Sequence, residues 1–170
     1  MIDMKKLTTL CLSLVVCFVW IGLVSGGNDS ALEAQMNTLK QECKELITGS
    51  RYEGSKITYF NAGNSKQTKN VEVFLFLSNE YQFAISAKKC SVPVSVKVYD
   101  ASNEMKERTL IKEFRKVQGT SWKFSSNELN DLYLKKKPDS ERLKNIHIEY
   151  SIGSGKESKE GIVLVYGNKS

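Results

Sequence analysis

Histidine is nearly absent from this sequence, since its 170 residues contain only His147. A zinc site built on several imidazoles is therefore excluded, and a histidine-dependent catalytic triad would have to run through this one residue. The sequence also lacks a CxxC pair and a glycine-rich phosphate-binding loop, the motifs of many redox, metal and nucleotide sites. These absences argue against most enzyme chemistry, and we expect no cofactor and no metal.

Cysteine is scarce as well, and two of the four cysteines, Cys11 and Cys17, fall in the first 26 residues. This segment has the layout of a secretory signal peptide: two lysines, an apolar run from Leu10 to Val24, and then small residues. We predict cleavage near Gly27, a single domain over residues 27–170, and a location in the periplasm or outside the cell. An uncleaved membrane anchor is the alternative, because a run of about 15 apolar residues nearly spans a thin bilayer.

Cys43 and Cys90 are the cysteines that remain after cleavage. In an oxidising compartment, two cysteines without a third predict one disulfide. In the chain-entropy model, closing a loop of this length stabilises the fold by about 4 kcal/mol. The alternative is a pair of separately buried thiols.

An amphipathic helix is predicted over residues 30–48. Ser30 and Glu33 form a capping box, and Gly49 stands where a left-handed C-terminal cap is needed. The apolar stripe comprises Leu32, Met36, Leu39, Cys43, Leu46 and Ile47. Its helical spacing requires this face to be buried.

From Lys56 onward, apolar residues recur at every second position between short turn segments. The predicted strands are 56–61, 70–76, 81–87, 92–99, 109–116, 121–125, 146–152 and 161–166. About eight short strands predict a mainly β domain, an antiparallel β-sandwich of the jelly-roll or Greek-key type with the helix packed on it. The predicted core comprises Val73, Leu75, Phe83, Ile85, Val94, Val96, Phe114, Phe124, Ile148, Val163 and Val165.

Two kinds of side chain are candidates for a functional site. Paired carboxylates, as glycoside hydrolysis requires, occur at Glu128 with Asp131 and at Asp139 with Glu141, although in lysine-rich surroundings typical of solvated loops. Aromatic residues are candidates for a sugar-binding face, although most of them also suit the core. They are Tyr59, Phe60, Tyr81, Tyr99, Trp122 and Phe124.

The longest segment without regular periodicity is 127–145, with a possible helical turn over 128–134. Long connections in compact domains are often functional or mobile. Its basic residues are the predicted contacts for a polyanionic partner such as an acidic glycan or a lipid headgroup. They are Lys135, Lys136, Lys137, Arg142 and Lys144. A disordered lysine-rich loop is the alternative, and nucleic acid is not expected, because the basic run lacks interleaved aromatic residues.

The segments NEYQFAIS, VPVSVKVYD, WKFSS, IHIEYSIG and GIVLVYG occur in an order that resembles small uncharacterised secreted β-sandwich proteins of Bacteroidetes-type bacteria. The order is also similar to jelly-roll modules of secreted peptidases. These resemblances imply a compartment and a fold, and they place no catalytic residue on this chain. We therefore predict a non-catalytic, extracytoplasmic binding or accessory module, with an envelope protein or an anionic surface as partner. The alternatives are a secreted hydrolase using loop carboxylates and a structural envelope component.

Overall fold

The computed structural model describes residues 27–115 and 117–169. The predicted signal peptide, residues 1–26, lies outside the described residues. The described residues fall into two units: residues 27–34, which are helical, and the described part of 35–169, which is compact. Among the described residues, no helix is both long enough and apolar enough to cross a membrane.

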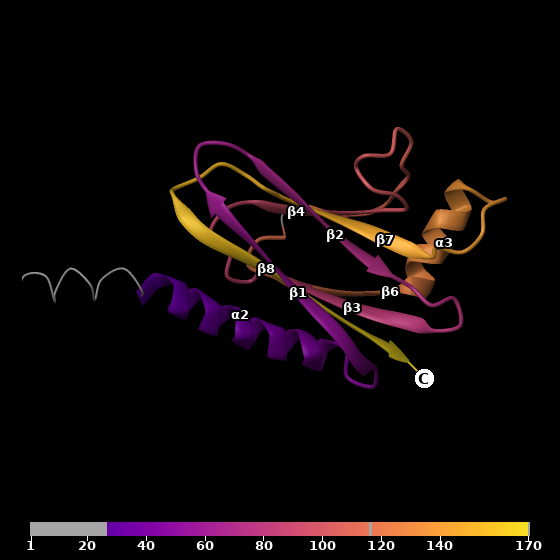
Figure 1. Ribbon diagram of the computed structural model, residues 1–170, viewed down its shortest axis with the longest axis horizontal. Coiled ribbons are helices and arrows are strands. Elements are labelled where there is room, and N and C mark those ends of the chain that lie inside the picture. The colour runs from indigo at the N-terminus through magenta and orange to yellow at the C-terminus, as the bar shows by residue number, and fades with distance from the viewer. Residues whose placement is uncertain (1–26, 116, 170) are drawn as a thin grey trace, which may run out of the picture. The chain divides into compact units, whose positions relative to one another are not determined.

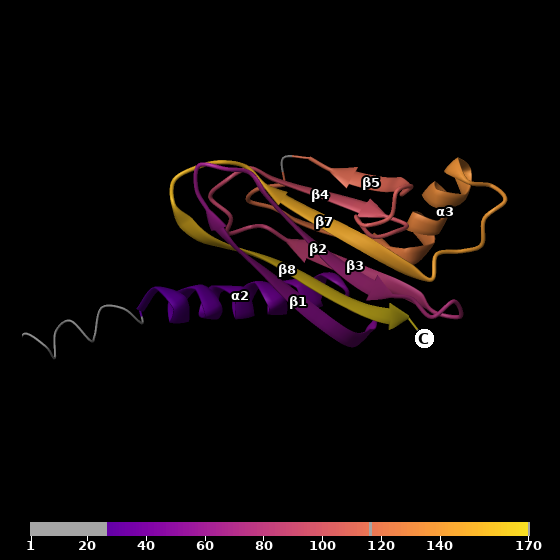
Figure 2. The same cartoon turned by 45° about the horizontal axis from the view of Figure 1, so that its top comes forward.

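The described residues contain eight strands in two four-stranded antiparallel sheets, which are stacked face to face (Figures 1 and 2). Sheet A has the order β1-β8-β3-β6, and sheet B has the order β2-β7-β4-β5. The strands are β1 (Arg51–Ala62), β2 (Gln67–Phe74), β3 (Glu80–Ser86), β4 (Val94–Tyr99), β5 (Leu110–Phe114), β6 (Ser121–Ser125), β7 (Asn145–Ile152) and β8 (Ser158–Lys169). This strand order is that of a double-sheet jelly roll, so the predicted fold class is confirmed.

The core between the sheets is formed by alternate residues of each strand, as the sequence pattern predicts. Two predicted core residues, Val163 and Val165, are buried on the other face of β8, because Ile162 and Leu164 occupy the positions that point between the sheets. Strand β8 is therefore apolar on both faces. Its outer face needs a cover of its own.

The Gln35–Leu46 part of helix α2 (Gly27–Leu46) packs on this outer face and buries Met36, Leu39 and Cys43. A side chain at Gly161 of β8 would collide with the Met36 sulfur, so glycine is what lets the helix approach the strand. The described helix already includes residues 27–29, ahead of the predicted start at residue 30. It ends before the predicted residue 48, and Gly49 has the positive φ expected there, +90°.

The predicted disulfide between Cys43 and Cys90 is not present in the structure, where both residues are buried free thiols. Cys43 lies on the buried stripe of α2, whereas Cys90 belongs to the core cluster, with its Sγ 3.4 Å from the Gly161 carbonyl oxygen. In the sequence, Cys43 and Cys90 each lie at the edge of an apolar segment. The sequence does not reveal that these two segments belong to different layers of the fold. Burial raises the pKa of each thiol to about 12, which disfavours the thiolate that disulfide exchange requires.

The connection predicted to be long and irregular, residues 127–145, consists mostly of helix α3 (Ser126–Lys136). The loop that follows is tied to this helix by Asn130, which is buried and accepts a hydrogen bond from the Leu143 amide at 2.8 Å. Leu143 itself is buried in the core cluster. This loop is therefore anchored at its end, which argues against the alternative of a disordered lysine-rich loop.

Lysines cover the neighbouring edge strands β1 and β2. The Lys56 Nζ donates to the Glu72 carbonyl oxygen at 2.9 Å, and the Lys69 Nζ donates to the Tyr59 carbonyl oxygen at 2.6 Å. At the opposite edges, α3 packs beside β5 and β6. These contacts occupy backbone carbonyl groups with which an added strand would have to form hydrogen bonds. They therefore disfavour the binding of a partner by strand addition.

Candidate functional site

The outer face of sheet B is polar and is not covered by a described helix. Its side chains point away from the core, because the residues between them, such as Val73, Ile146 and Ile148, are buried in it. The cross-strand rows on this face, in order along β2, are Phe74–Asn145, Glu72–His147–Tyr99, Asn70–Glu149–Lys97 and Thr68–Ser151–Ser95. Hydrogen-bonding side chains of three strands are thus brought side by side.

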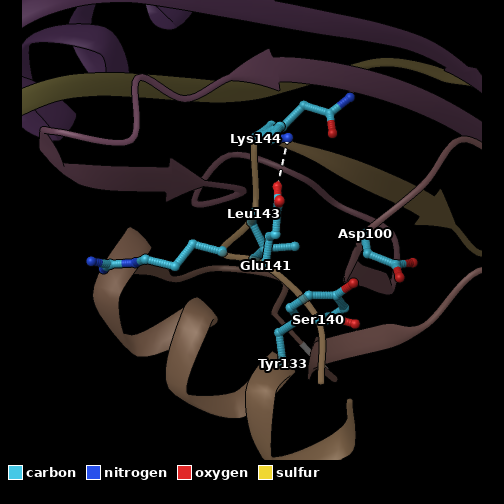
Figure 3. Close-up of a pocket in the computed structure, with 8 residues that line it drawn as sticks. Asp100, Tyr133, Ser140, Glu141, Leu143 and Lys144 are labelled. Atoms are coloured by element: carbon cyan, nitrogen blue, oxygen red, sulfur yellow. Dashed lines mark ion pairs between the residues drawn. The ribbon is translucent and has the colours of Figure 1, made fainter. Parts of the chain in front are cut away.

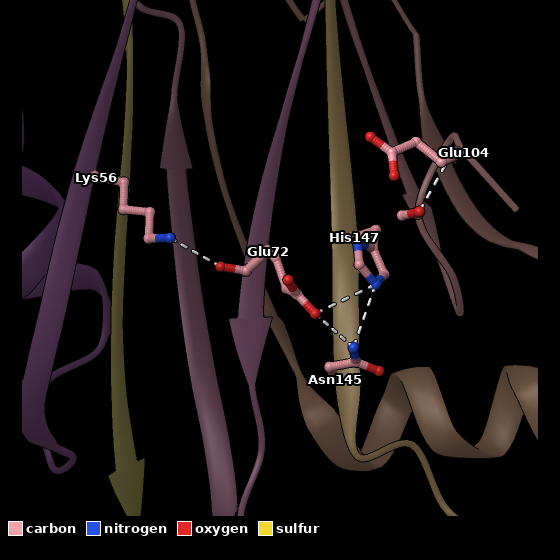
Figure 4. A network of polar contacts seen from close by, with 6 residues as sticks. Lys56, Glu72, Glu104, Asn145 and His147 are labelled. Atoms are coloured by element: carbon pink, nitrogen blue, oxygen red, sulfur yellow. Dashed lines mark hydrogen bonds and ion pairs between the residues drawn. The ribbon is translucent and has the colours of Figure 1, made fainter.

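Glu72, Asn145 and His147 form a hydrogen-bonded cluster on this face (Figure 4). Asn145 Nδ2 donates to Glu72 Oε1 at 2.6 Å and lies 3.2 Å from His147 Nε2. His147 Nε2 is 3.5 Å from the same Glu72 Oε1. These contacts fix three polar side chains from neighbouring strands, and both contacts to Glu72 fall on one of its two oxygens.

A hollow of about 650 Å³ opens beside this cluster, and the turn 100–105 forms its other wall. Asp100 holds this wall in place: its Oδ1 accepts from the Thr109 amide at 2.5 Å, and its Oδ2 is 3.0 Å from the Lys137 Nζ. Burial alone would raise the pKa of Asp100. The hydrogen bonds from Thr109 and Lys137 outweigh that effect, so the net pKa lies below the ordinary value and the carboxylate stays ionised.

A second hollow, of about 310 Å³, adjoins the first, since Asp100 and Asn145 line both. Figure 3 shows its walls, which come from Tyr133 of α3 and from the loop 140–144. Amide, hydroxyl and charged groups dominate the lining of both hollows. An apolar ligand would leave these groups without hydrogen-bond partners, so the site favours a polar ligand.

Two phenylalanines extend the polar face along β2. Phe74 is 70% exposed and Phe76 is 69% exposed, while Leu75 between them is buried. The Leu75 amide donates to the Lys144 carbonyl oxygen at 2.9 Å, so the pairing of β2 with the β7 side continues past Phe74. The Phe74 ring therefore points to the same side of the sheet as Glu72, and Phe76 follows it two residues later, at the start of the turn that leads to β3. Neighbouring exposed apolar side chains of this size are typical of binding surfaces.

The residues predicted to contact a polyanion lie at the end of α3 and in the loop after it, and most of them bind the protein itself. These contacts are Lys136 with the Leu110 carbonyl, Lys137 with Asp100, Arg142 with Asn127, and Lys144 with Glu141. Lys135 and Lys136 occupy the last turn of α3, where positive charge is favourable next to the helix dipole. The basic residues thus have structural roles, and their contact with a polyanion stays a prediction.

The predicted carboxylate pairs do not have the features of a glycosidase site. Glu128 forms an ion pair with Lys112, while Asp131 and Asp139 are exposed. A hydrogen bond from Lys144 lowers the pKa of Glu141, although a general acid for glycoside hydrolysis needs a raised pKa. Among the described residues, no group of three or more His, Cys, Asp or Glu side chains is arranged to hold a metal ion.

The predicted aromatic face does not form. Phe60, Tyr81 and Phe124 are buried in the core, and the Tyr99 ring is covered by the Arg108 guanidinium, 3.8 Å from the ring centroid. The two remaining residues are Trp122, which packs against Phe114, and Tyr59, which is 41% exposed on sheet A. None of the six predicted aromatics therefore presents an open ring on the polar face of sheet B.

Sequence reasoning missed Phe74 and Phe76, although the sequence contains a signal for them. In the segment NVEVFLFL, Val71, Val73 and Leu75 occupy the core-facing positions. Strict alternation then puts both phenylalanines on the same face as Glu72. An aromatic residue at a position where the pattern requires a polar one predicts an exposed ring.

No protein-family model and no curated protein sequence matches this chain. Similar solved structures include PirA, with 9% identity, coverage of 71% of this chain and 98% of that one, and a TM-score of 0.38. The Yersinia pseudotuberculosis-derived mitogen matches at 7% identity, over 67% and 85% of the chains, with a TM-score of 0.37. A structure of carbohydrate-binding modules from the β-sandwich superfamily matches at 8% identity, over 69% and 55%, with a TM-score of 0.34. Similarity this low carries no information about function, which has to be inferred from the side chains of this chain.

Proposed function

We propose that this protein is a non-catalytic carbohydrate-binding module that works outside the cytoplasm. The observation that carries the proposal is the direct junction, on one sheet face, between a polar hollow and the exposed Phe74, which the equally exposed Phe76 follows two residues later. Sugar rings have hydroxyl groups at their edges and C–H groups on their faces. A site for them therefore needs hydrogen-bonding groups beside a flat apolar surface, and Phe74 lies in the cross-strand row of Asn145, next to Glu72.

The polar part of the site is organised before any ligand binds. The contacts among Glu72, Asn145 and His147 hold their side chains in one arrangement, and Asp100 fixes the opposite wall. A ligand would then lose little free energy in ordering these groups. Binding without catalysis agrees with the carboxylates described above, because Glu128 and Glu141 are both held by lysines.

A periplasmic or secreted location belongs to the same proposal. It is supported by the signal-like layout of residues 1–26 and by the resemblance to secreted β-sandwich proteins of Bacteroidetes-type bacteria. Glycans of the envelope or of the surroundings are accessible from that location. The mature protein from such a host should begin near Gly27.

Changing both phenylalanines to alanine is expected to weaken carbohydrate binding about 100-fold, and Phe74→Ala alone about 10-fold, because each ring loses its stacking surface. Both side chains are largely exposed, so the fold should tolerate the changes. Affinity electrophoresis in gels containing single polysaccharides (glucans, galactans, mannans, xylans, pectate and alginate) measures the effect.

The matched control is Tyr59→Ala, which removes an exposed aromatic ring from sheet A and should leave binding unchanged. Circular dichroism and thermal melts of all variants should coincide with the parent protein. If no polysaccharide retards the parent protein, or if the double variant is retarded like the parent, the proposed function is wrong.

A further inference from the structure

The charges around the site indicate which carbohydrates it accepts. The larger hollow is lined by three carboxylates, Glu72, Asp100 and Glu104, and its described lining contains no lysine or arginine. The cations around the hollow have partners: Lys137 pairs with Asp100 of the hollow itself, and Arg108 pairs with Glu149 at 2.8 Å. In the adjoining hollow, Lys144 pairs with Glu141. A uronic acid or sulfated sugar would be placed beside the like charges of Glu72 and Glu104, and no lysine or arginine of the described lining compensates them, which costs binding free energy.

The same carboxylates suit hydroxyl groups. Both contacts that Glu72 makes with Asn145 and His147 fall on Oε1, so Oε2 can accept a hydrogen bond from a ligand. A carboxylate can accept several hydrogen bonds, and those from a neutral hydroxyl to a charged acceptor are among the stronger ones. The amides of Asn70 and Asn145 add donors and acceptors on the same surface.

The extent of the site indicates the length of the ligand. Asn70, which lines the hollow, and Phe74 lie four positions apart on the same face of β2, and the exposed Phe76 follows two residues beyond Phe74. At the rise of a β-strand, the separation of Asn70 and Phe74 is roughly 13 Å, and Phe76 extends the surface further. One sugar ring covers only a fraction of that length, so a single ring cannot contact the hollow and both phenylalanines together.

We propose that the ligand is a linear, uncharged oligosaccharide of several rings that lies along β2, with one part hydrogen-bonded in the hollow and the next rings stacked on Phe74 and Phe76. This inference rests on the proposed function and adds three properties of the ligand: its charge class, its minimum length and its orientation along β2. The site thereby selects neutral chains over the acidic glycans that the basic residues of α3 suggest.

The test is isothermal titration calorimetry of the mature protein, at about 0.15 M salt, with two length series. One series consists of neutral oligosaccharides from one to six rings, prepared from the retained polysaccharides or from cellulose and mannan. The other consists of oligogalacturonates of the same lengths. We expect affinity to rise at least about 10-fold from two rings to six in the neutral series, and the six-ring galacturonate to bind at least about 10-fold more weakly than its neutral counterpart.

Two variants separate the parts of the inference. Glu72→Gln combined with Glu104→Gln should reduce the preference for the neutral series, because two of the three like charges are removed. Phe76→Ala should flatten the dependence on length while leaving the affinity for two-ring ligands nearly unchanged.

The inference fails if galacturonates bind as tightly as neutral chains or if one ring binds as tightly as six. In that case a loss of binding in the phenylalanine double variant would still uphold the proposed function. If the variant with both phenylalanines changed to alanine also binds every ligand as tightly as the parent protein, the inference and the proposed function are both wrong. An affinity for neutral oligosaccharides that rises with their length and is weakened by Phe76→Ala supports both the inference and the proposed function.

Discussion

Raising the pH from 9 to 10.5 is expected to lower the free energy of unfolding by about 3 kcal/mol, half of it from each buried thiol. The pKa of Cys43 and of Cys90 is raised by burial from 9.0 to about 12 in the folded chain. Well below pH 9 both thiols are neutral in the folded and the unfolded protein. Above it the unfolded chain loses these protons first, so stability falls until the pH passes the folded pKa.

Urea unfolding followed by tryptophan fluorescence at several pH values measures this loss, and the control is the double variant Cys43→Ala with Cys90→Ala. The variant should start less stable at pH 7 but lose clearly less stability over the same pH interval. A remaining slope is expected from Tyr150, whose pKa is raised by complete burial. Equal slopes in parent and variant, or a non-reduced mass that shows the two cysteines joined, would refute the thiol explanation.

Replacing Gly167 with alanine is expected to destabilise the fold by about 3 kcal/mol, which is the upper range for inserting atoms into a packed site. A Cβ atom at this position would overlap the carbonyl oxygen of Arg51 on β1 and lie 3.0 Å from its carbonyl carbon. These are backbone atoms and cannot rotate away. Gly167 pairs with Tyr52 next to a register shift in β1, so the collision would separate β1 from β8 at this end.

Gly63→Ala is the matched control, because a Cβ there would meet nothing within 4 Å and its φ is not positive. Its free energy of unfolding should stay within about 0.5 kcal/mol of the parent value. Chemical denaturation at pH 7 gives both numbers. Similar effects of the two substitutions would mean that β1 does not approach β8 closely at Gly167.

Much of the architecture is encoded in local patterns that can be recognised in the sequence. The alternation around Val73 and Ile148 identifies strands with one buried face, and the stripe that includes Met36 and Cys43 identifies a helix that must be covered. What the patterns do not give is the assignment of each strand to a sheet. For that reason the sequence pattern assigns Val163 and Val165 to the core between the sheets, although they lie on the other face of β8. It likewise predicts a disulfide between Cys43 and Cys90, which are free thiols in different layers of the structure.

The candidate site was harder to predict, because it is built from residues distant in the sequence. Glu72 and Asn145 meet only when β2 pairs with β7, and Asp100 reaches them through the turn after β4. A run of lysines is easy to recognise in a sequence, but the carboxylates with which the lysines form ion pairs in the fold are not. Lys137 and Lys144 therefore suggested a free basic surface, whereas each is paired with a carboxylate in the fold.

The most direct test of the central claim is to map the binding site by NMR, titrating the labelled mature protein with a neutral six-ring oligosaccharide. We expect the largest shifts of backbone amide signals in residues 70–76, 100–105 and 145–147, with little change in α2 or on sheet A. Shifts confined to α2, to sheet A or to the basic residues 135–137, or the absence of any shift with every neutral oligosaccharide in the series, would contradict that claim.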